Sequence, residues 1–76
     1  MDKISIILSV MSEVLETSIT SEMLDCKLSD LPNFESIAFL QIVGELEDQG
    51  LLFDIANIDN NQTIRDFSQH VELKNG

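Results

Sequence analysis

The sequence predicts a small all-α fold, a four-helix bundle of three longer helices and one short helix. Three observations favour it: the length of 76 residues, apolar residues at helical spacing in three separate segments, and the lack of a second strand-like segment to complete a sheet. The whole chain, residues 1–76, is expected to form one domain. A domain of this size buries only about 60% of the surface that its unfolded chain exposes. We therefore do not expect an enzyme, and no catalytic residue is predicted.

The first helix is expected over residues 2–16. Apolar residues recur there at i, i+3, i+4 and i+7, the spacing of one helix face, and serines and glutamates fall on the other side. The apolar face consists of Ile4, Ile7, Leu8, Met11, Val14 and Leu15. Because three serines and Glu13 interrupt the apolar run, this segment is an amphipathic helix rather than a signal peptide, and a cytoplasmic protein is inferred.

Residues 17–35 form a long connection that is rich in turn-forming residues such as Thr17, Ser29 and Pro32. A loop of this length inside a compact domain is usually functional. Apolar side chains are spread through it and are expected to hold it against the core. They are Ile19, Met23, Leu24, Leu28 and Leu31.

The second helix is expected from Ser36 to about Gln49, with Gly50 as its stop signal. At 100° per residue, one side is apolar and is the predicted core face, and the opposite side is polar. The core face collects Phe39, Ile42, Val43 and Leu46. The polar side collects Gln41, Gly44 and Asp48, with Glu45 and Glu47 at its flanks. Ile37 also falls on the polar side, so it is predicted to face solvent.

Residues 51–58 (LLFDIANI) suit a strand by composition, but a single strand leaves its backbone groups unpaired. A short helix or turn is therefore predicted there. The last helix is expected to begin at Thr63, whose side chain caps it, with Asp66 in the third position of a capping box. Its inner face is predicted to consist of Ile64, Phe67 and Val71.

The charge balance limits the possible partners. Fourteen acidic residues face four basic ones, which gives a formal net charge of −10. Nucleic acid and anionic membrane surfaces are not expected as partners because both require clustered Lys and Arg, and a basic protein surface is the natural complement.

Cys26 has no second cysteine to pair with and is expected to be a buried or half-buried apolar residue. With His70 as the sole histidine, no metal-ligand cluster is predicted.

Ser36 stands at the start of the second helix, and the residues leave two interpretations of it open. Serine is a preferred N-cap residue, worth about 1 kcal/mol over alanine, and Glu35 before it suits the helix dipole. The alternative is a docking surface, in which Ser36, the exposed Ile37 and the acidic face serve a partner. Nucleophilic catalysis is set aside because a serine nucleophile needs an adjacent base, and His70 is expected on a flank of the last helix.

The segment Glu35-Ser36-Ile37 resembles the Asp-Ser-Leu motif that opens the second helix of acyl and peptidyl carrier proteins. The resemblance covers nearly the whole chain in length and helix order. It implies that Ser36 bears 4′-phosphopantetheine, attached from coenzyme A through a phosphodiester, whose thiol holds the cargo as a thioester. It also implies partner contacts at Glu35, Ile37, Gln41, Gly44, Glu45, Glu47 and Asp48. The chain departs from the family at Glu35, where Asp is usual, and at Asn33, where Gly is usual.

The resemblance further implies a set of partners: a phosphopantetheinyl transferase, a loading enzyme of the adenylation or acyltransferase type, and downstream condensing or transfer enzymes. A monomeric, free-standing carrier is expected. Neutral Ala38 and Gln41 after the serine, and a Phe39 that fills the space for a long hidden chain, favour a carrier of secondary metabolism, of the nonribosomal peptide or polyketide type. Its cargo would be an aminoacyl, aryl or short acyl group. The alternatives are a carrier of fatty-acid synthesis and an unmodified acidic helical adaptor.

Overall fold

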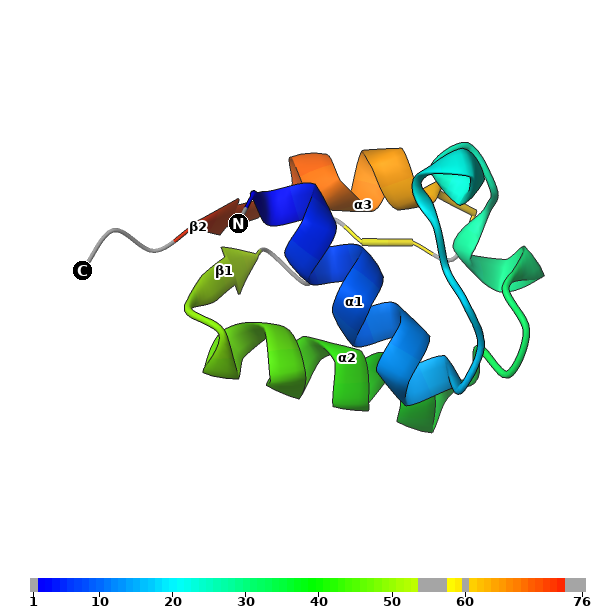
Figure 1. The fold of residues 1–76 in the computed structure, drawn as a ribbon, viewed down its shortest axis with the longest axis horizontal. Helices are drawn as coiled ribbons and strands as arrows, with labels where there is room; N and C mark the ends of the chain where they lie inside the picture. Colours follow the sequence, from blue (N-terminus) through cyan, green and yellow to red (C-terminus); the bar gives the residue numbers. More distant parts are fainter. Residues whose placement is uncertain (1, 54–57, 60, 74–76) are drawn as a thin grey trace.

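The fold was analysed in a computed structural model, which describes residues 2–53, 58–59 and 61–73. Its α-helices are α1 (Lys3–Leu15), α2 (Ser36–Asp48) and α3 (Ile64–Gln69). Two short 3₁₀ turns, Ser21–Met23 and Leu28–Asp30, lie between α1 and α2, and two strands, β1 (Leu51–Phe53) and β2 (Val71–Leu73), follow α2 and α3. Figure 1 shows α1 crossing between α2 and α3, with the two strands together at one end. The prediction of an all-α four-helix bundle is confirmed in its mostly helical character, but β1 and β2 form a two-stranded sheet that it did not include.

The predicted inner faces of α1 and α2 are largely confirmed. On α1, Ile7, Met11 and Leu15 are buried, and Val10 joins them although the sequence pattern missed it. The predicted core residues Leu8, Val14 and Phe39 are half-buried and pack against the core. Ile4 was also predicted to belong to the core, but it is half-buried, and Ile6 packs against the core from this part of the helix instead. On α2, the fully or nearly fully buried residues are Ile42, Val43 and Leu46. The core therefore lies between these two helices and the first turns of α3.

The prediction of a helix or turn from residue 51 is wrong, because the first three residues of that segment form a strand. β1 pairs antiparallel with β2, in the register Leu51 to Leu73, Leu52 to Glu72 and Phe53 to Val71. Val71 therefore belongs to a strand rather than to the last helix, although it is fully buried as predicted. Residues 54–57 of the predicted short helix lie outside the described residues. That short helix is therefore not among the elements that the structure describes.

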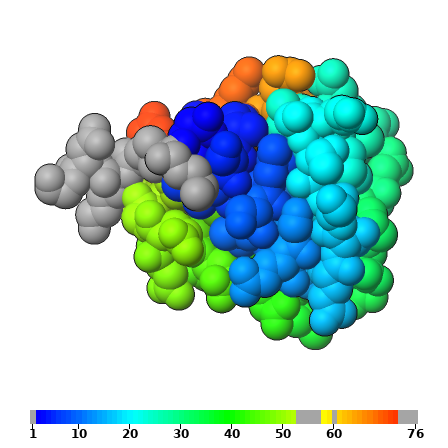
Figure 2. Space-filling model, viewed as in Figure 1, coloured from blue at the N-terminus to red at the C-terminus, as the bar shows by residue number. Residues whose placement is uncertain are grey.

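The connection between α1 and α2 is held against the core, as predicted. Ile19, Leu28 and Leu31 are buried, and Figure 2 shows this segment lying directly against α1. The Ser12 hydroxyl fixes its beginning, because its oxygen accepts a hydrogen bond from the Ile19 N–H at 2.9 Å. This long loop is therefore an ordered part of the domain.

The middle of the loop is also hydrogen-bonded to the start of α3 and the residue before its cap. The Leu28 N–H donates to the Gln62 carbonyl at 2.8 Å, and the Ile64 N–H donates to the Cys26 carbonyl at 3.2 Å. The prediction of a buried or half-buried Cys26 is wrong, because its backbone makes this contact while its side chain is exposed. No helix among the described residues is long and apolar enough to cross a membrane.

Candidate functional site

The first turn of α2 is built without a side-chain cap. Glu35, rather than Ser36, occupies the N-cap position, with extended backbone angles of φ −123° and ψ 171°. Its side chain makes no capping hydrogen bond, and Ser36 is the first helical residue. The interpretation of Ser36 as the helix cap is therefore wrong. Its side chain is exposed, and its hydroxyl has no hydrogen-bond partner in the described part of the chain.

Three backbone donors at this helix start are also unused. The first hydrogen bond of the helix runs from the Phe39 N–H to the Glu35 carbonyl, at 2.8 Å. The N–H groups of Ser36, Ile37 and Ala38 have no partner among the described residues, as expected for the first turn of an uncapped helix. Free N–H groups and the helix dipole together favour a negative charge at this position. The start of α2 therefore suits an anionic group attached to Ser36.

An open hollow of about 530 Å³ lies beside Ser36 and is lined by Phe34, Glu35, Ser36, Phe39 and Leu40. Two edge-to-face ring contacts extend from this hollow into the core. The rings of Phe34 and Phe39 are 6.0 Å apart between centroids, and those of Phe39 and Phe67 are 6.5 Å apart. Since Phe67 is completely buried, the aromatic rings occupy the path from the hollow toward the core.

The outward face of α2 carries two apolar side chains. Ile37 is 69% exposed, which confirms that it faces solvent, and Leu40 is 65% exposed. Leu40 was not predicted on either face of the helix. The same 100° step would have found it, since it lies only 60° from Ile37 around the helix. Leu40 also lines the hollow beside Ser36.

The predicted partner residues of α2 are all exposed, but the structure divides them between two sides. One group lines a second hollow, of about 620 Å³, between α1 and α2: Gln41, Gly44, Glu45 and Asp48 from α2, with Glu13, Val14 and Glu16 from α1. Glu35 lines the first hollow instead. Glu47 is exposed on the flank opposite Glu45. The contribution of α1 to the acidic hollow was missed because a helical-wheel pattern shows no contacts between helices.

The structure does not bring His70, the sole histidine, to Ser36. His70 follows the end of α3, beside β2, and Figure 1 shows this end of the molecule opposite the start of α2. Within residues 2–53, 58–59 and 61–73, no group of three or more His, Cys, Asp or Glu side chains is placed to hold a metal ion. The arrangement at Ser36 is a free hydroxyl with free N–H donors, which suits attachment of a group rather than chemistry on a substrate.

Comparison with known proteins agrees with this geometry. The family model described as "phosphopantetheine attachment site" matches residues 5–71, which is most of the chain. The chain belongs to this family, that of the acyl and peptidyl carrier proteins. Such domains are carriers rather than enzymes, and they hold 4′-phosphopantetheine covalently. No curated protein and no solved structure matches the chain with significant similarity.

Proposed function

We propose that Ser36 is the residue of this carrier that bears 4′-phosphopantetheine. The observation that supports it is the free, exposed Ser36 hydroxyl at a helix start that no side chain caps. A phosphodiester on Ser36 lies beside the unused N–H groups of Ile37 and Ala38, where the helix dipole stabilises its charge. The bound arm supplies a thiol that carries the cargo as a thioester. The residues of this chain hold and present the arm, and they perform no step on the cargo.

The exposed face of α2 is proposed as the surface that visiting enzymes contact. Ile37 and Leu40 offer apolar area beside the attachment serine, and the acidic hollow offers four carboxylates, those of Glu13, Glu16, Glu45 and Asp48. These carboxylates, together with those of the predicted residues Glu35 and Glu47, suit a partner with a basic surface, and the predicted residues Gln41 and Gly44 are proposed as neutral contacts on the same face. Their attraction is long-ranged and weakened by salt, which suits short encounters with several enzymes. The partners proposed are a phosphopantetheinyl transferase, a loading enzyme and a condensing or transfer enzyme.

The proposed pathway type is secondary metabolism, with an aminoacyl, aryl or short acyl cargo. The rings of Phe34, Phe39 and Phe67 lie where a long chain would have to enter the core from the side of Ser36. Displacing them would cost packing that a domain of this size cannot easily lose. A short cargo needs no such displacement, because it stays outside the core. A carrier of fatty-acid synthesis is the alternative.

The attachment is tested by intact-mass measurement after incubation with coenzyme A and a broad-specificity phosphopantetheinyl transferase. We expect the wild-type chain to gain one phosphopantetheine. Ser36→Ala should gain none, and the control Ser29→Ala, which removes another exposed serine, should be modified like the wild type. A folded wild-type chain that gains no mass would contradict the proposal and favour an unmodified adaptor built on the carrier fold.

The cargo class is tested by the lifetime of two thioesters on the modified protein, one with an octanoyl and one with an aryl group, in the presence of hydroxylamine. If the core does not admit a long chain, the octanoyl thioester is cleaved as fast as the same thioester on free pantetheine. Slower cleavage on the protein would show that the chain is sheltered, and the fatty-acid alternative would then replace the proposed one. Phe39→Ala is the matched variant, since it opens the path to the core.

A further inference from the structure

Asn33, three residues before Ser36, adopts a backbone conformation that few residues accept. Its φ is +61°, in the left-handed region that glycine and asparagine tolerate best. Glycine accepts this conformation at least as readily, so the conformation alone does not require asparagine. Asparagine brings a side-chain amide that glycine lacks, and the structure uses it.

The Asn33 amide joins the loop to the end of α1. Its Nδ2 donates a hydrogen bond to the Leu15 carbonyl at 2.9 Å, across 18 residues of sequence. Leu15 is the last residue of α1, and the carbonyls of the last turn have no partner within their own helix. The helix ends immediately afterwards at Glu16, whose φ is +55°. Asn33 thus caps the C-terminal end of α1 with a side chain that comes from the loop before α2.

Within the described part of the chain, no other side-chain hydrogen bond lies closer in sequence to Ser36 on its N-terminal side than that of Asn33. Between the two residues, the Phe34 N–H makes a long hydrogen bond of 3.4 Å to the Leu31 carbonyl, and the Glu35 side chain makes no cap. The segment is otherwise held by the edge-to-face contact of the Phe34 ring with Phe39 and by the Glu35 carbonyl, which accepts from the Phe39 N–H at 2.8 Å. The Asn33 amide adds the side-chain hydrogen bond that joins this segment to α1. A partner that recognises Ser36 must either find this segment in place or order it on binding.

We propose that Asn33 is a positioning residue for the modification of Ser36. Its amide holds the Asn33–Ser36 segment against the end of α1, so that the transferase meets the serine already in place. Because only the ordered fraction of the protein is competent to bind, loss of the tie raises the concentration of carrier that the transferase needs. The chemistry at the hydroxyl is unchanged once the complex has formed. This inference rests on the proposed attachment at Ser36.

The test compares steady-state modification of the wild type, Asn33→Gly and Asn33→Asp by a phosphopantetheinyl transferase with excess coenzyme A. Both variants tolerate the left-handed backbone, and neither has a side-chain donor for the Leu15 carbonyl. We expect KM for the carrier to rise by roughly three- to tenfold, the factor of one ordinary hydrogen bond, while kcat is unchanged. Amide hydrogen exchange at Phe34, whose N–H bonds the Leu31 carbonyl, should become faster in the unmodified variants.

The control is Thr63→Ala, which removes a capping side chain from α3. If KM rises in the Asn33 variants because Ser36 is no longer held in position, then Thr63→Ala should lower the melting temperature but leave KM unchanged. An unchanged KM in both Asn33 variants, or an equal rise in Thr63→Ala, would overturn the positioning role while the modification itself stands. A wild-type chain that is never modified would overturn the proposed function, and the positioning role with it.

Discussion

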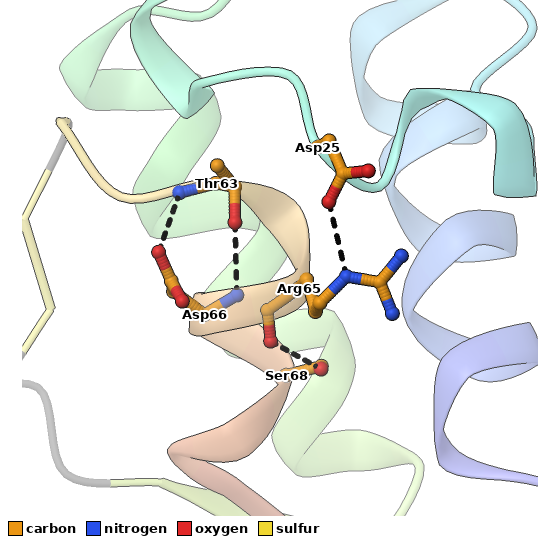
Figure 3. Close-up of polar contacts among 5 residues, drawn as sticks. All are labelled: Asp25, Thr63, Arg65, Asp66 and Ser68. Atoms are coloured by element: carbon orange, nitrogen blue, oxygen red, sulfur yellow. Dashed lines mark hydrogen bonds and ion pairs between the residues drawn. The ribbon is translucent and has the colours of Figure 1, made fainter.

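The first turns of α2 and α3 differ in how they use their polar groups. At α3 the Thr63 hydroxyl accepts a hydrogen bond from the Asp66 N–H at 3.1 Å, and the Asp66 carboxylate accepts one from the Thr63 N–H at 3.3 Å (Figure 3). The Ile64 and Arg65 N–H groups donate to carbonyls of the connection between α1 and α2, those of Cys26 and Leu24, at 3.2 and 2.9 Å. At α2 the corresponding hydroxyl and N–H groups have no partner in the described residues.

This difference separates a helix start that stabilises the fold from one that is available to a ligand. The first turn of α3 has its polar groups satisfied within the protein, and α1 is likewise capped by the Asp2 carboxylate, which accepts from the Ser5 N–H at 2.7 Å. The first turn of α2 is exposed, so water satisfies its groups and leaving them unpaired costs little. An attached phosphodiester can replace that water.

The largest expected effect separates the two faces of α2 itself. Leu46 is completely buried, so Leu46→Ala removes core contacts and should lower the free energy of unfolding by about 2–5 kcal/mol. Leu40 is exposed, so the matched change Leu40→Ala should alter it by less than about 0.5 kcal/mol. Urea denaturation followed by circular dichroism measures both. Equal effects of the two substitutions would contradict the assignment of the faces.

A smaller effect tests the two helix starts directly. Thr63→Ala removes one side of the capping box and should lower the free energy of unfolding by about 1 kcal/mol. Ser36→Ala removes a hydroxyl that bonds nothing in the described structure and should change it by less than about 0.5 kcal/mol. Thermal melts of both variants at one buffer composition give the comparison. If Ser36→Ala lowered the free energy of unfolding as much as Thr63→Ala does, the Ser36 hydroxyl would have to cap α2 in solution.

The ion pair at the start of α3 should contribute less than the capping box. Arg65 Nε lies 3.0 Å from Asp25 Oδ1, but the side chains are 53% and 82% exposed, so water weakens their attraction. Asp25→Asn is expected to cost about 0.2–1 kcal/mol at low salt. In about 1 M NaCl, where charges are screened within roughly 3 Å, the difference from the wild type should disappear. A difference that persists in high salt would indicate a role beyond charge.

The smallest effect concerns the cap of α1 and its dependence on pH. The hydrogen bond from the Ser5 N–H lowers the pKa of Asp2 below its ordinary value of 3.8. The charged cap therefore adds stability above pH 3.8, and this contribution is lost as the pH falls through the lowered pKa of the folded state. The stability difference between the wild type and Asp2→Asn should be constant near neutral pH and shrink in acid. If the stability difference between the wild type and Asp2→Asn grew in acid, it would contradict a cap that depends on the charged carboxylate.

Local patterns in the sequence were enough to predict features that depend on a single helix. The helical spacing gave α1 and α2, the Thr63–Asp66 pair gave the capping box, and the position of Ile37 on the polar side gave its exposure. The strand at Leu51–Phe53 was missed because its partner is a three-residue strand 18 to 22 residues away. A strand that short shows no alternation of its own, so only the pairing defines it.

For the candidate site, the sequence indicated which residues to consider but not how they are arranged. The Glu35-Ser36-Ile37 segment indicated where to look, but it could not show that Glu35 would take the cap position and leave Ser36 free. Contacts between distant segments were also hidden, such as the Asn33 amide on the Leu15 carbonyl and the α1 carboxylates beside α2. These depend on how the elements pack, which spacing along one helix does not record.

The central claim is that the uncapped start of α2 receives the attached group. It is tested most directly by comparing the ¹H–¹⁵N spectra of the protein before and after modification with coenzyme A and a transferase. The account predicts the largest amide shifts at Ser36, Ile37 and Ala38, and little change at the capped first turns of α1 and α3. Largest shifts at either capped turn, or a modified protein whose Ser36–Ala38 amides do not move, would contradict it.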